Sequence, residues 1–277
     1  MAKIIAAYAA SHAPLVARDW HILPQHHKDR LSAAYRELGR RLSAAKPDVI
    51  VEIAPDHWSN FFINNLPNVC IGVGEMHDGP PEPFLKDYPF NPMQGAPELA
   101  MHILKTALDN DFEPSVSHHM KLDHGFCIPL MRMELTALPP IVPIVINSLE
   151  EPMPSLKRCL AWGKLIRQAV ESYPENLRVA VLTSGGLSHS IGEPTMGAID
   201  EAFDHECIEA FRTGAEAPLL SFLEAHVTKA GNGAQEVRNW LVAHGAAQAR
   251  GFELIDYFPV PEVYVGCGFA AWKIAQS

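Results

Sequence analysis

The stretch from Asp48 to Trp58 constrains the fold of this chain most. It reads Asp-Val-Ile-Val-Glu-Ile-Ala-Pro-Asp-His-Trp, and its first half is a short β-branched run typical of a strand covered on both faces. Pro55 ends the run and leaves Asp56 and His57 in a loop. In open α/β sheets, ligands bind in the crevice outside the carboxyl ends of the strands. We therefore expect His57 at a position suited to a metal ligand or an acid–base group.

A second histidine follows the first predicted strand. The apolar run 3–10 reads as a buried strand and leads directly into a loop that contains His12. Residues 27–45 carry apolar positions close to helical spacing, so they predict a helix that crosses over to the strand before His57. Because crossovers between parallel strands form βαβ units, we expect His12 and His57 at the same edge of the sheet.

Two further histidines occupy similar settings. His124 lies in a predicted turn, Leu-Asp-His-Gly-Phe, that leads into a helix expected at 130–135. His189 follows the predicted strand 177–183 through a loop with paired glycines, which lets the backbone turn sharply and approach a ligand closely. Taken singly, each of the four histidines is more often a hydrogen-bonded structural residue than a functional one. Their shared setting at predicted strand exits indicates a common site.

The size and charge of the chain limit its class. A chain of 277 residues with 48% hydrophobic residues buries a large core, and we expect residues 1–277 to form one α/β domain. The formal net charge of −10 and the pI near 5.7 speak against nucleic acid or an anionic membrane as partner. Small molecules and proteins stay open as partners.

The cysteine pattern fits a protein of the reducing cytoplasm. Five scattered cysteines without a C-x-x-C pair favour neither a disulfide framework nor a thiolate zinc site. The first ten residues resemble a weak signal peptide, although they fit a first buried strand at least as well. No apolar run approaches the ~20 residues needed to cross a bilayer.

The segment 79–92 is rich in proline. Five prolines in fourteen residues exclude regular secondary structure. Two interpretations stay open for this segment: a rim or lid over a pocket, or a surface connection with no functional role.

A carboxylate completes a potential metal site. In the stretch 231–240, Asn232 is placed to cap a helix, with Gln235 three residues later as in a capping box. Glu236 then falls in the first helical turn, where the helix dipole favours an ionised carboxylate. Two imidazoles and one carboxylate form the facial triad of non-haem Fe(II) oxygenases, and His12, His57 and Glu236 can supply it. His124 and His189 would then carry protons, for which a pKa near neutral is suited.

Five motifs in order resemble one family of enzymes. They are Ser11-His-Ala-Pro14, Ala54-Pro-Asp-His57, Leu122-Asp-His-Gly-Phe126, Ser184-Gly-Gly-Leu-Ser-His189 and Gly231-Asn-Gly-Ala-Gln-Glu236. The chain is similar over nearly its whole length to extradiol ring-cleaving dioxygenases of the protocatechuate 4,5-dioxygenase beta-subunit superfamily. The resemblance implies a single α/β domain with a mixed, mainly parallel central sheet flanked by helices. It also implies non-haem Fe(II) and O2-dependent cleavage of a catechol-type ring in aromatic catabolism.

The resemblance also implies residue roles. His12, His57 and Glu236 match the family's iron ligands, and His124 and His189 match its two acid–base catalytic histidines. We assign His189 to deprotonation of substrate or steering of oxygen, and His124 to delivery of a proton.

The resemblance leaves the substrate open. Parts of the chain look like the 2,3-dihydroxyphenylpropionate 1,2-dioxygenase branch, and others look like gallate and protocatechuate enzymes. A protocatechuate, a gallate or its methyl ether, a substituted catechol, an aminophenol and a hydroxypyridone all fit the iron chemistry. The family further implies a homo-oligomer, with an additional small helical subunit in some members.

Three other functions compete with this hypothesis. A zinc-dependent hydrolase could use His12, His57 and Glu236, because this ligand set also suits zinc. A binding or signalling relative would be expected to lose a ligand, whereas all five positions are filled here. A serine hydrolase is disfavoured because the sequence lacks the G-x-S-x-G elbow.

Overall fold

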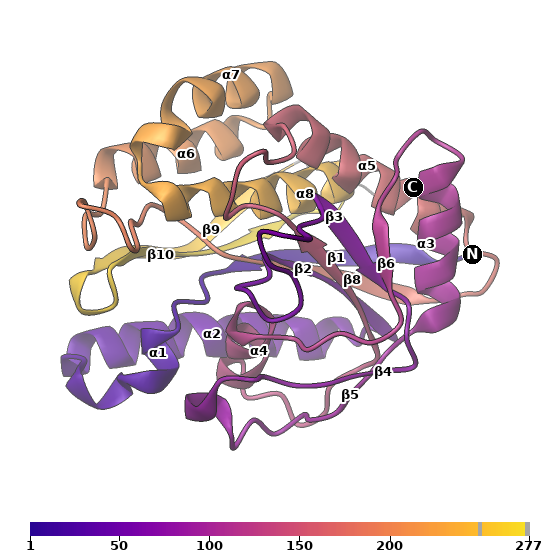
Figure 1. Cartoon of the computed structure of the whole chain (residues 1–277), viewed down its shortest axis with the longest axis horizontal. Coiled ribbons are helices and arrows are strands. Elements are labelled where there is room, and N and C mark those ends of the chain that lie inside the picture. Colours follow the sequence, from indigo (N-terminus) through magenta and orange to yellow (C-terminus); the bar gives the residue numbers. More distant parts are fainter. Residues whose placement is uncertain (249–250, 275–277) are drawn as a thin grey trace.

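The computed structural model of the protein describes residues 1–248 and 251–274. Figure 1 shows a central sheet with helices on both faces. Eight strands form this sheet in the order β6-β3-β7-β2-β8-β1-β10-β9. Their bounds are β1 Lys3–Ala10, β2 Val49–Ala54, β3 Val69–Gly72, β6 Ser115–Ser117, β7 Ile141–Ile146, β8 Arg178–Ser184, β9 Phe252–Val260 and β10 Val265–Trp272. A separate two-stranded sheet pairs β4 Met76–His77 with β5 Met93–Gln94.

The sheet is mixed, with a parallel centre. The four central strands β7, β2, β8 and β1 are parallel to one another. Strand β10 is antiparallel to β1, β9 to β10, and β3 to β7, and the edge strand β6 is parallel to β3. Both faces of β2, β7 and β10 are buried along their whole length, which explains why these strands are almost wholly apolar, with Glu52 of β2 the charged exception among them. The predicted α/β fold with a mixed, mainly parallel sheet is confirmed.

The helices divide between the two faces of the sheet (Figure 1). One face is covered by α1 Leu15–Arg18, α2 Gln25–Ala45 and α4 His124–Arg132, and the other by α3 Pro97–Leu108, α5 Leu156–Ser172, α6 Glu201–Thr213, α7 Glu216–His226 and α8 Val237–Ala247. The described residues also form the short 3-10 helices η1 Trp20–Ile22, η2 Pro83–Leu85, η3 Val227–Lys229, η4 Asn232–Glu236 and η5 Pro261–Val263. Each face thus has its own hydrophobic core, so the sheet is held in place from both sides.

Three adjacent strands bring their carboxyl ends together. Strand β8 lies between β2 and β1, and its register pairs Thr183 with Ile53 and Ser184 with Ala10. The loops that follow these strands therefore leave the sheet side by side. This confirms the predicted βαβ unit of β1, α2 and β2, and it brings His12 and His57 to one edge.

The segment around His124 differs from the prediction. Helix α4 starts at His124 itself rather than near residue 130. The carboxylate of Asp123 accepts a hydrogen bond from the backbone N–H of Gly125 at 2.8 Å and so caps the helix. Pro129 lies inside this helix. His124 is thus held by a helix start and not by a strand exit.

Among the helices in the described ranges, none is both long and apolar enough to cross a membrane. All five cysteines are buried and free.

Candidate metal centre

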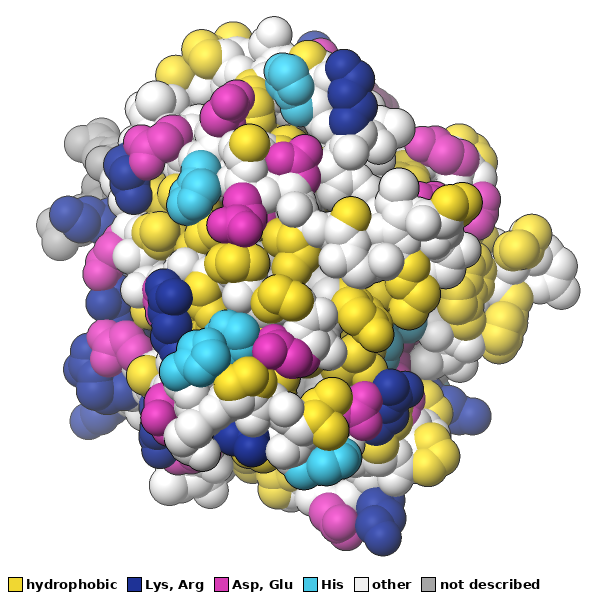
Figure 2. All heavy atoms as spheres, turned by 90° about the vertical axis from the view of Figure 1, so that its left-hand side faces the viewer, with side chains coloured by type: hydrophobic (Ala, Val, Ile, Leu, Met, Phe, Trp, Pro, Cys, Tyr) yellow, Lys and Arg dark blue, Asp and Glu magenta, His cyan; other side chains and the backbone are white. Residues whose placement is uncertain are grey.

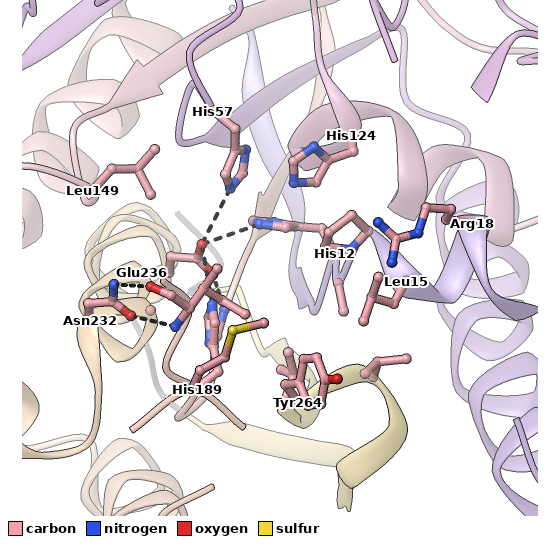
Figure 3. Close-up of a pocket in the computed structure, with 18 of the residues that line it drawn as sticks. His12, Leu15, Arg18, His57, His124, Leu149, His189, Asn232, Glu236 and Tyr264 are labelled. Atoms are coloured by element: carbon pink, nitrogen blue, oxygen red, sulfur yellow. Dashed lines mark hydrogen bonds and ion pairs between the residues drawn. The ribbon is translucent and has the colours of Figure 1, made fainter. Parts of the chain in front are cut away.

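Three side chains from distant parts of the chain converge above the carboxyl ends of the central strands (Figure 3). Nε2 of His12 lies 3.3 Å from Oε1 of Glu236, and Nε2 of His57 lies 3.7 Å from the same oxygen. The rings of His12 and His57 are 5.0 Å apart between centroids and nearly perpendicular. Both imidazoles therefore aim at one oxygen of a single buried carboxylate.

Glu236 is fixed by the glycine loop that follows β8. Its Oε2 atom accepts a hydrogen bond from the backbone N–H of Gly186 at 2.7 Å, which leaves Oε1 for the imidazoles. Gly185 has a φ of +120°, and a Cβ there would come within 2.7 Å of Oε2. The paired glycines are thus required by backbone conformation and by close approach to the carboxylate.

Each of four histidines is oriented through its Nδ1 atom. Hydrogen bonds join Nδ1 to Ser184 Oγ in His12 at 3.0 Å, to Glu82 Oε1 in His124 at 2.6 Å and to the carbonyl of Leu187 in His189 at 2.9 Å. Nδ1 of His57 makes no hydrogen bond among the described residues but faces Asp123 Oδ2 at 3.4 Å. With Nδ1 held in this way, Nε2 is the nitrogen left for the centre. Such outer contacts fix the ring orientation and tautomer of histidines that bind metals.

The charges of the site suit a cation. Although burial alone raises the pKa of Glu236, His12 and His189 hold that pKa well below its ordinary value. Burial likewise opposes ionisation of Asp123, yet His57 lowers the pKa of this carboxyl. Burial lowers the pKa of His12. For His57, burial also lowers the pKa, but the carboxylates of Asp123 and Glu236 outweigh it and raise the pKa to about 10. Two ionised carboxylates are therefore buried among imidazoles.

The donor set fits a divalent metal ion. The contacts of 3.3 and 3.7 Å from the two Nε2 atoms to Glu236 are longer than good N–H···O hydrogen bonds. They match the separation of ligand atoms that share one ion, since such atoms each lie about 2.1 Å from it. Imidazole nitrogens and a carboxylate oxygen suit iron and zinc. The nearby carboxylates hold a proton on His57 in the absence of an ion, and a bound ion would replace that proton.

His124 and His189 border the same centre. Nε2 of His189 lies 3.9 Å from Oε1 of Glu236, and the ring of His124 lies 4.0 Å from that of His57 between centroids. One ring nitrogen from each of His12, His57 and His124 lies within 4.8 Å of the corresponding nitrogens of the other two. By distance alone, His124 therefore competes with Glu236 as the third metal ligand.

The centre lies in a cavity of about 690 Å³, which is typical of a small-molecule site. Helix α1 and the connection between β9 and β10 line this cavity and lie on the left of Figure 1. Figure 2 views that side and shows hydrophobic side chains gathered across the middle of the face, with charged side chains around them. The apolar lining residues include Leu15, Ile22, Leu149, Ile191, Met196 and Val263.

Sequence reasoning missed three supporting side chains and misjudged a fourth. Ser184, Asp123 and Glu82 hold the histidines, but each is an ordinary polar residue whose partner lies far away in the sequence. Asn232 does not cap a helix as predicted. Its side chain instead bonds the backbone of Ile191, accepting from N–H at 3.0 Å and donating to the carbonyl at 2.8 Å.

Other histidines stay outside the site. His77 is buried and its Nδ1 accepts a hydrogen bond from the backbone of Met120. His119 pairs with Asp78 at 2.8 Å on the surface. Neither histidine lines the cavity of the metal centre.

Comparison with known proteins gives the chain's family. Residues 6–265 match the sequence model described as the catalytic LigB subunit of aromatic ring-opening dioxygenase. The chain is 28% identical to a 2,3-dihydroxyphenylpropionate/2,3-dihydroxicinnamic acid 1,2-dioxygenase of Paraburkholderia phymatum, over 87% of this chain and 88% of the relative. It is 30% identical to a protein of the same name from Mycolicibacterium vanbaalenii, over 84% of this chain and 86% of the relative.

A solved structure shares the fold. An uncharacterized protein of Escherichia coli K12 superposes with a TM-score of 0.60 at 16% identity, covering 98% of this chain and 100% of that protein. With a family match over most of its length and a potential metal site at its sheet edge, the chain belongs to the family of catalytic subunits of aromatic ring-opening dioxygenases and is a metal-dependent, catechol-type ring-cleaving enzyme.

Proposed function

We propose that His12, His57 and Glu236 bind Fe(II) and that the enzyme cleaves a catechol-type ring beside its hydroxyl pair with O2, in aromatic catabolism. The convergence of two Nε2 atoms on Oε1 of Glu236 carries this proposal. We prefer Glu236 to His124 as third ligand because it brings negative charge to the ion, and because Gly186 aims its free oxygen at both imidazoles. When bound, Fe(II) would supply open positions for a diol and O2 and pass electrons between them.

The chain's own residues then move protons. His189, 3.9 Å from Glu236, is placed to take a proton from a substrate hydroxyl through Nε2, since its Nδ1 donates to a carbonyl. His124, on the His57 side of the cavity, is placed to deliver a proton to oxygen as the ring opens. Imidazole suits both tasks because its ordinary pKa is near neutral.

We further propose that the substrate carries an apolar, uncharged substituent. Arg18 is the one lysine or arginine among the described residues that line the cavity, and Asp19 already accepts from its Nε at 3.0 Å and its Nη2 at 2.7 Å. Glu150 and Glu262 add negative charge to the same lining. A carboxylate on the substrate would thus meet net repulsion, whereas the aliphatic wall favours an alkyl or aryl group.

A substrate with an uncharged substituent would differ from the 2,3-dihydroxyphenylpropionate in the names of the relatives. Dihydroxyphenylpropionate carries a carboxylate, so 3-propylcatechol and 3-(2,3-dihydroxyphenyl)propionate form a matched pair. We expect a kcat/KM at least about tenfold higher for 3-propylcatechol, the ratio that corresponds to about 1.4 kcal/mol. A preference for the propionate that disappears in Arg18→Gln would show instead that Arg18 binds the carboxylate.

The decisive experiment is metal analysis of anaerobically purified protein, followed by O2 uptake with a panel of catechols, aminophenols and hydroxypyridones. We expect one iron per chain, lost in His12→Ala and Glu236→Gln but kept in His124→Phe. His102→Ala is the matched histidine control, because His102 lies half-buried on α3, bonded to Ser172 and outside the cavity lining. Iron loss in His124→Phe with retention in Glu236→Gln would assign the third ligand to His124.

A zinc hydrolase is the second candidate, because the same three residues suit Zn²⁺. Bound zinc together with ester or amide hydrolysis, and no O2 uptake, would favour it. The second pair of histidines beside the centre supports the dioxygenase, since a hydrolase needs one general base.

We also propose that residues 1–277 form one catalytic domain that works in the cytoplasm as a homo-oligomer. All five proposed site residues line one cavity beside a single eight-stranded sheet, which supports the single domain. Light scattering of the purified protein, alone and with any small helical subunit that copurifies, tests the assembly.

A further inference from the structure

The proline-rich segment 79–92 brings a carboxylate to the edge of the metal centre. Oε1 of Glu82 accepts a hydrogen bond from Nδ1–H of His124 at 2.6 Å and a second from the backbone N–H of His124 at 3.0 Å. The side chain of Glu82 is only 18% exposed, although the segment around it crosses the surface. The sequence alone did not decide whether this segment forms a rim over a pocket or a surface connection with no functional role.

The backbone of this segment is well anchored. Pro81 and Pro83 flank Glu82 and restrict the main chain on both sides. Leu85 and Tyr88 are buried in the same core as α4. These features hold Glu82 with little conformational freedom, so its contact with His124 costs less entropy than one made from a free loop.

Both hydrogen bonds that Glu82 accepts come from His124. The other carboxylate beside it, Asp123, instead accepts from the backbone N–H of His57 at 2.6 Å. Oε2 of Glu82 is buried and has no hydrogen-bond partner within the described ranges. No lysine or arginine is paired with Glu82 among those residues, so its interaction is not that of an ordinary surface ion pair.

Two bonds to one residue fix both position and tautomer. The backbone bond holds Glu82 at the first turn of α4, where the helix dipole favours a carboxylate. The ring bond requires the proton on Nδ1 of His124, which leaves Nε2 directed to the cavity. A histidine that carries protons needs this arrangement, because one nitrogen must stay free for transfer while the other anchors the ring.

We propose that Glu82 is the positioning residue for His124: it holds the ring in the Nδ1–H tautomer with Nε2 turned to the substrate. The inference rests on the proposed function, in which His124 delivers a proton. Glu82 is not among the described residues that line the cavity, so in this role it acts through His124.

Four variants test this role: Glu82→Gln, Glu82→Ala, His124→Phe and the double variant Glu82→Ala/His124→Phe. The amide oxygen in Glu82→Gln can still accept from Nδ1–H, so this variant should keep more activity than Glu82→Ala. Asp87→Asn is the matched control, because Asp87 lies exposed in the same segment.

In the iron-loaded enzyme we expect kcat to fall by about 10–100-fold in Glu82→Ala, the usual effect of removing such an outer carboxylate, with a smaller change in KM. The double variant should be no slower than His124→Phe, because two residues that act as a unit are not additive. Unchanged kcat in Glu82→Ala, or a further large loss in the double variant, would overturn the proposal.

A second readout does not depend on turnover. Long-range 1H–15N spectra of the metal-free protein show the tautomer of each histidine, and His124→Phe identifies the His124 signals. We expect Nδ1–H in the parent, in Glu82→Gln and in Asp87→Asn, and a shift toward Nε2–H in Glu82→Ala. An unchanged tautomer in Glu82→Ala would also refute the positioning role.

Metal counting separates positioning from binding. One carboxylate oxygen each from Glu82 and Asp123 and one nitrogen of His124 lie within 4.8 Å of one another. A second metal ion per chain that Glu82→Ala removes would show that Glu82 is a ligand and overturn the proposal. A parent enzyme that cleaves no catechol would instead refute the proposed function, while the spectra would still decide the tautomer.

Discussion

Asp123 holds His57 by two contacts. Its Oδ2 atom accepts a hydrogen bond from the backbone N–H of His57 at 2.6 Å and lies 3.4 Å from Nδ1 of the same residue. The carboxylate is buried, and it also caps helix α4 through Gly125. One side chain therefore joins the loop after β2 to the helix that begins at His124.

We expect Asp123→Asn to weaken Fe(II) binding by about 10–100-fold, because the neutral amide orients His57 less firmly and makes it a weaker ligand. Titration with Fe(II) under anaerobic conditions measures the change. Asp78→Asn is the matched control, since Asp78 pairs with His119 on the surface. Equal affinities in Asp123→Asn and the parent would mean that Asp123 serves only the helix.

Gly233 leaves room for His189. A Cβ at this position would overlap the imidazole of His189, including Nε2. Gly233→Ala should therefore displace the ring and lower kcat at least about tenfold, while the iron content stays at the parent level, because proton transfer depends on hydrogen-bond reach. Gly192→Ala is the control, since nothing lies within 4 Å of a Cβ there. Normal turnover in Gly233→Ala would argue against a role for His189.

Glu52 is buried in the central strand β2, and neither of its carboxylate oxygens has a hydrogen-bond partner among the described residues. Burial raises the pKa of Glu52 well above its ordinary value. We expect Glu52→Met to raise the free energy of unfolding by about 1–3 kcal/mol at neutral pH, because it removes an unsatisfied buried polar group. Urea denaturation measures this, with Glu52→Gln as the variant that keeps a polar group. A less stable Glu52→Met would point to a partner for the carboxyl.

Asp204 gives the stability a pH dependence. It accepts hydrogen bonds from Ser188 and Tyr257, yet burial outweighs them and raises its pKa from 3.8 to about 7. A folded-state pKa above the unfolded value means that the folded protein binds the proton more tightly. This contribution to stability is complete below the unfolded pKa and is lost as pH rises through about 7.

We therefore compare the free energy of unfolding of the parent with that of Asp204→Asn. The difference should shift against the parent by roughly 2–4 kcal/mol as pH rises from 3.8 to about 7, since one pKa unit corresponds to about 1.4 kcal/mol. Urea denaturation at several pH values measures the difference. Glu201→Gln, exposed on the same helix, is the control. A pH-independent difference between the parent and Asp204→Asn would contradict the raised pKa.

Local sequence was enough to predict the strands that carry the site. The apolar runs before His12, His57 and His189 form β1, β2 and β8. The paired glycines after β8 were expected to let the backbone approach a ligand, and in the structure they approach the carboxylate of Glu236. Strands of this kind are specified by a few consecutive residues, because a strand buried on both faces is mostly apolar along its whole length. The order of these motifs along the chain also predicted the family, which the comparisons confirmed.

Other parts of the prediction were wrong. Helix α4 begins at His124, several residues before the expected start, because Asp123 caps it. Asn232 bonds the backbone of Ile191 instead of capping a helix. In both cases a polar side chain had several possible backbone partners, and tertiary packing chose among them.

The sequence by itself determined the strands, the loops that follow them and the residue types able to bind a metal ion. The tertiary structure decided that β8 lies between β2 and β1, which brings His12 and His57 together, and that Gly186 aims Glu236 at them. It also decided that Glu82 holds His124. The reason is physical: strand formation depends on neighbouring residues, whereas a contact between distant side chains depends on how whole elements pack.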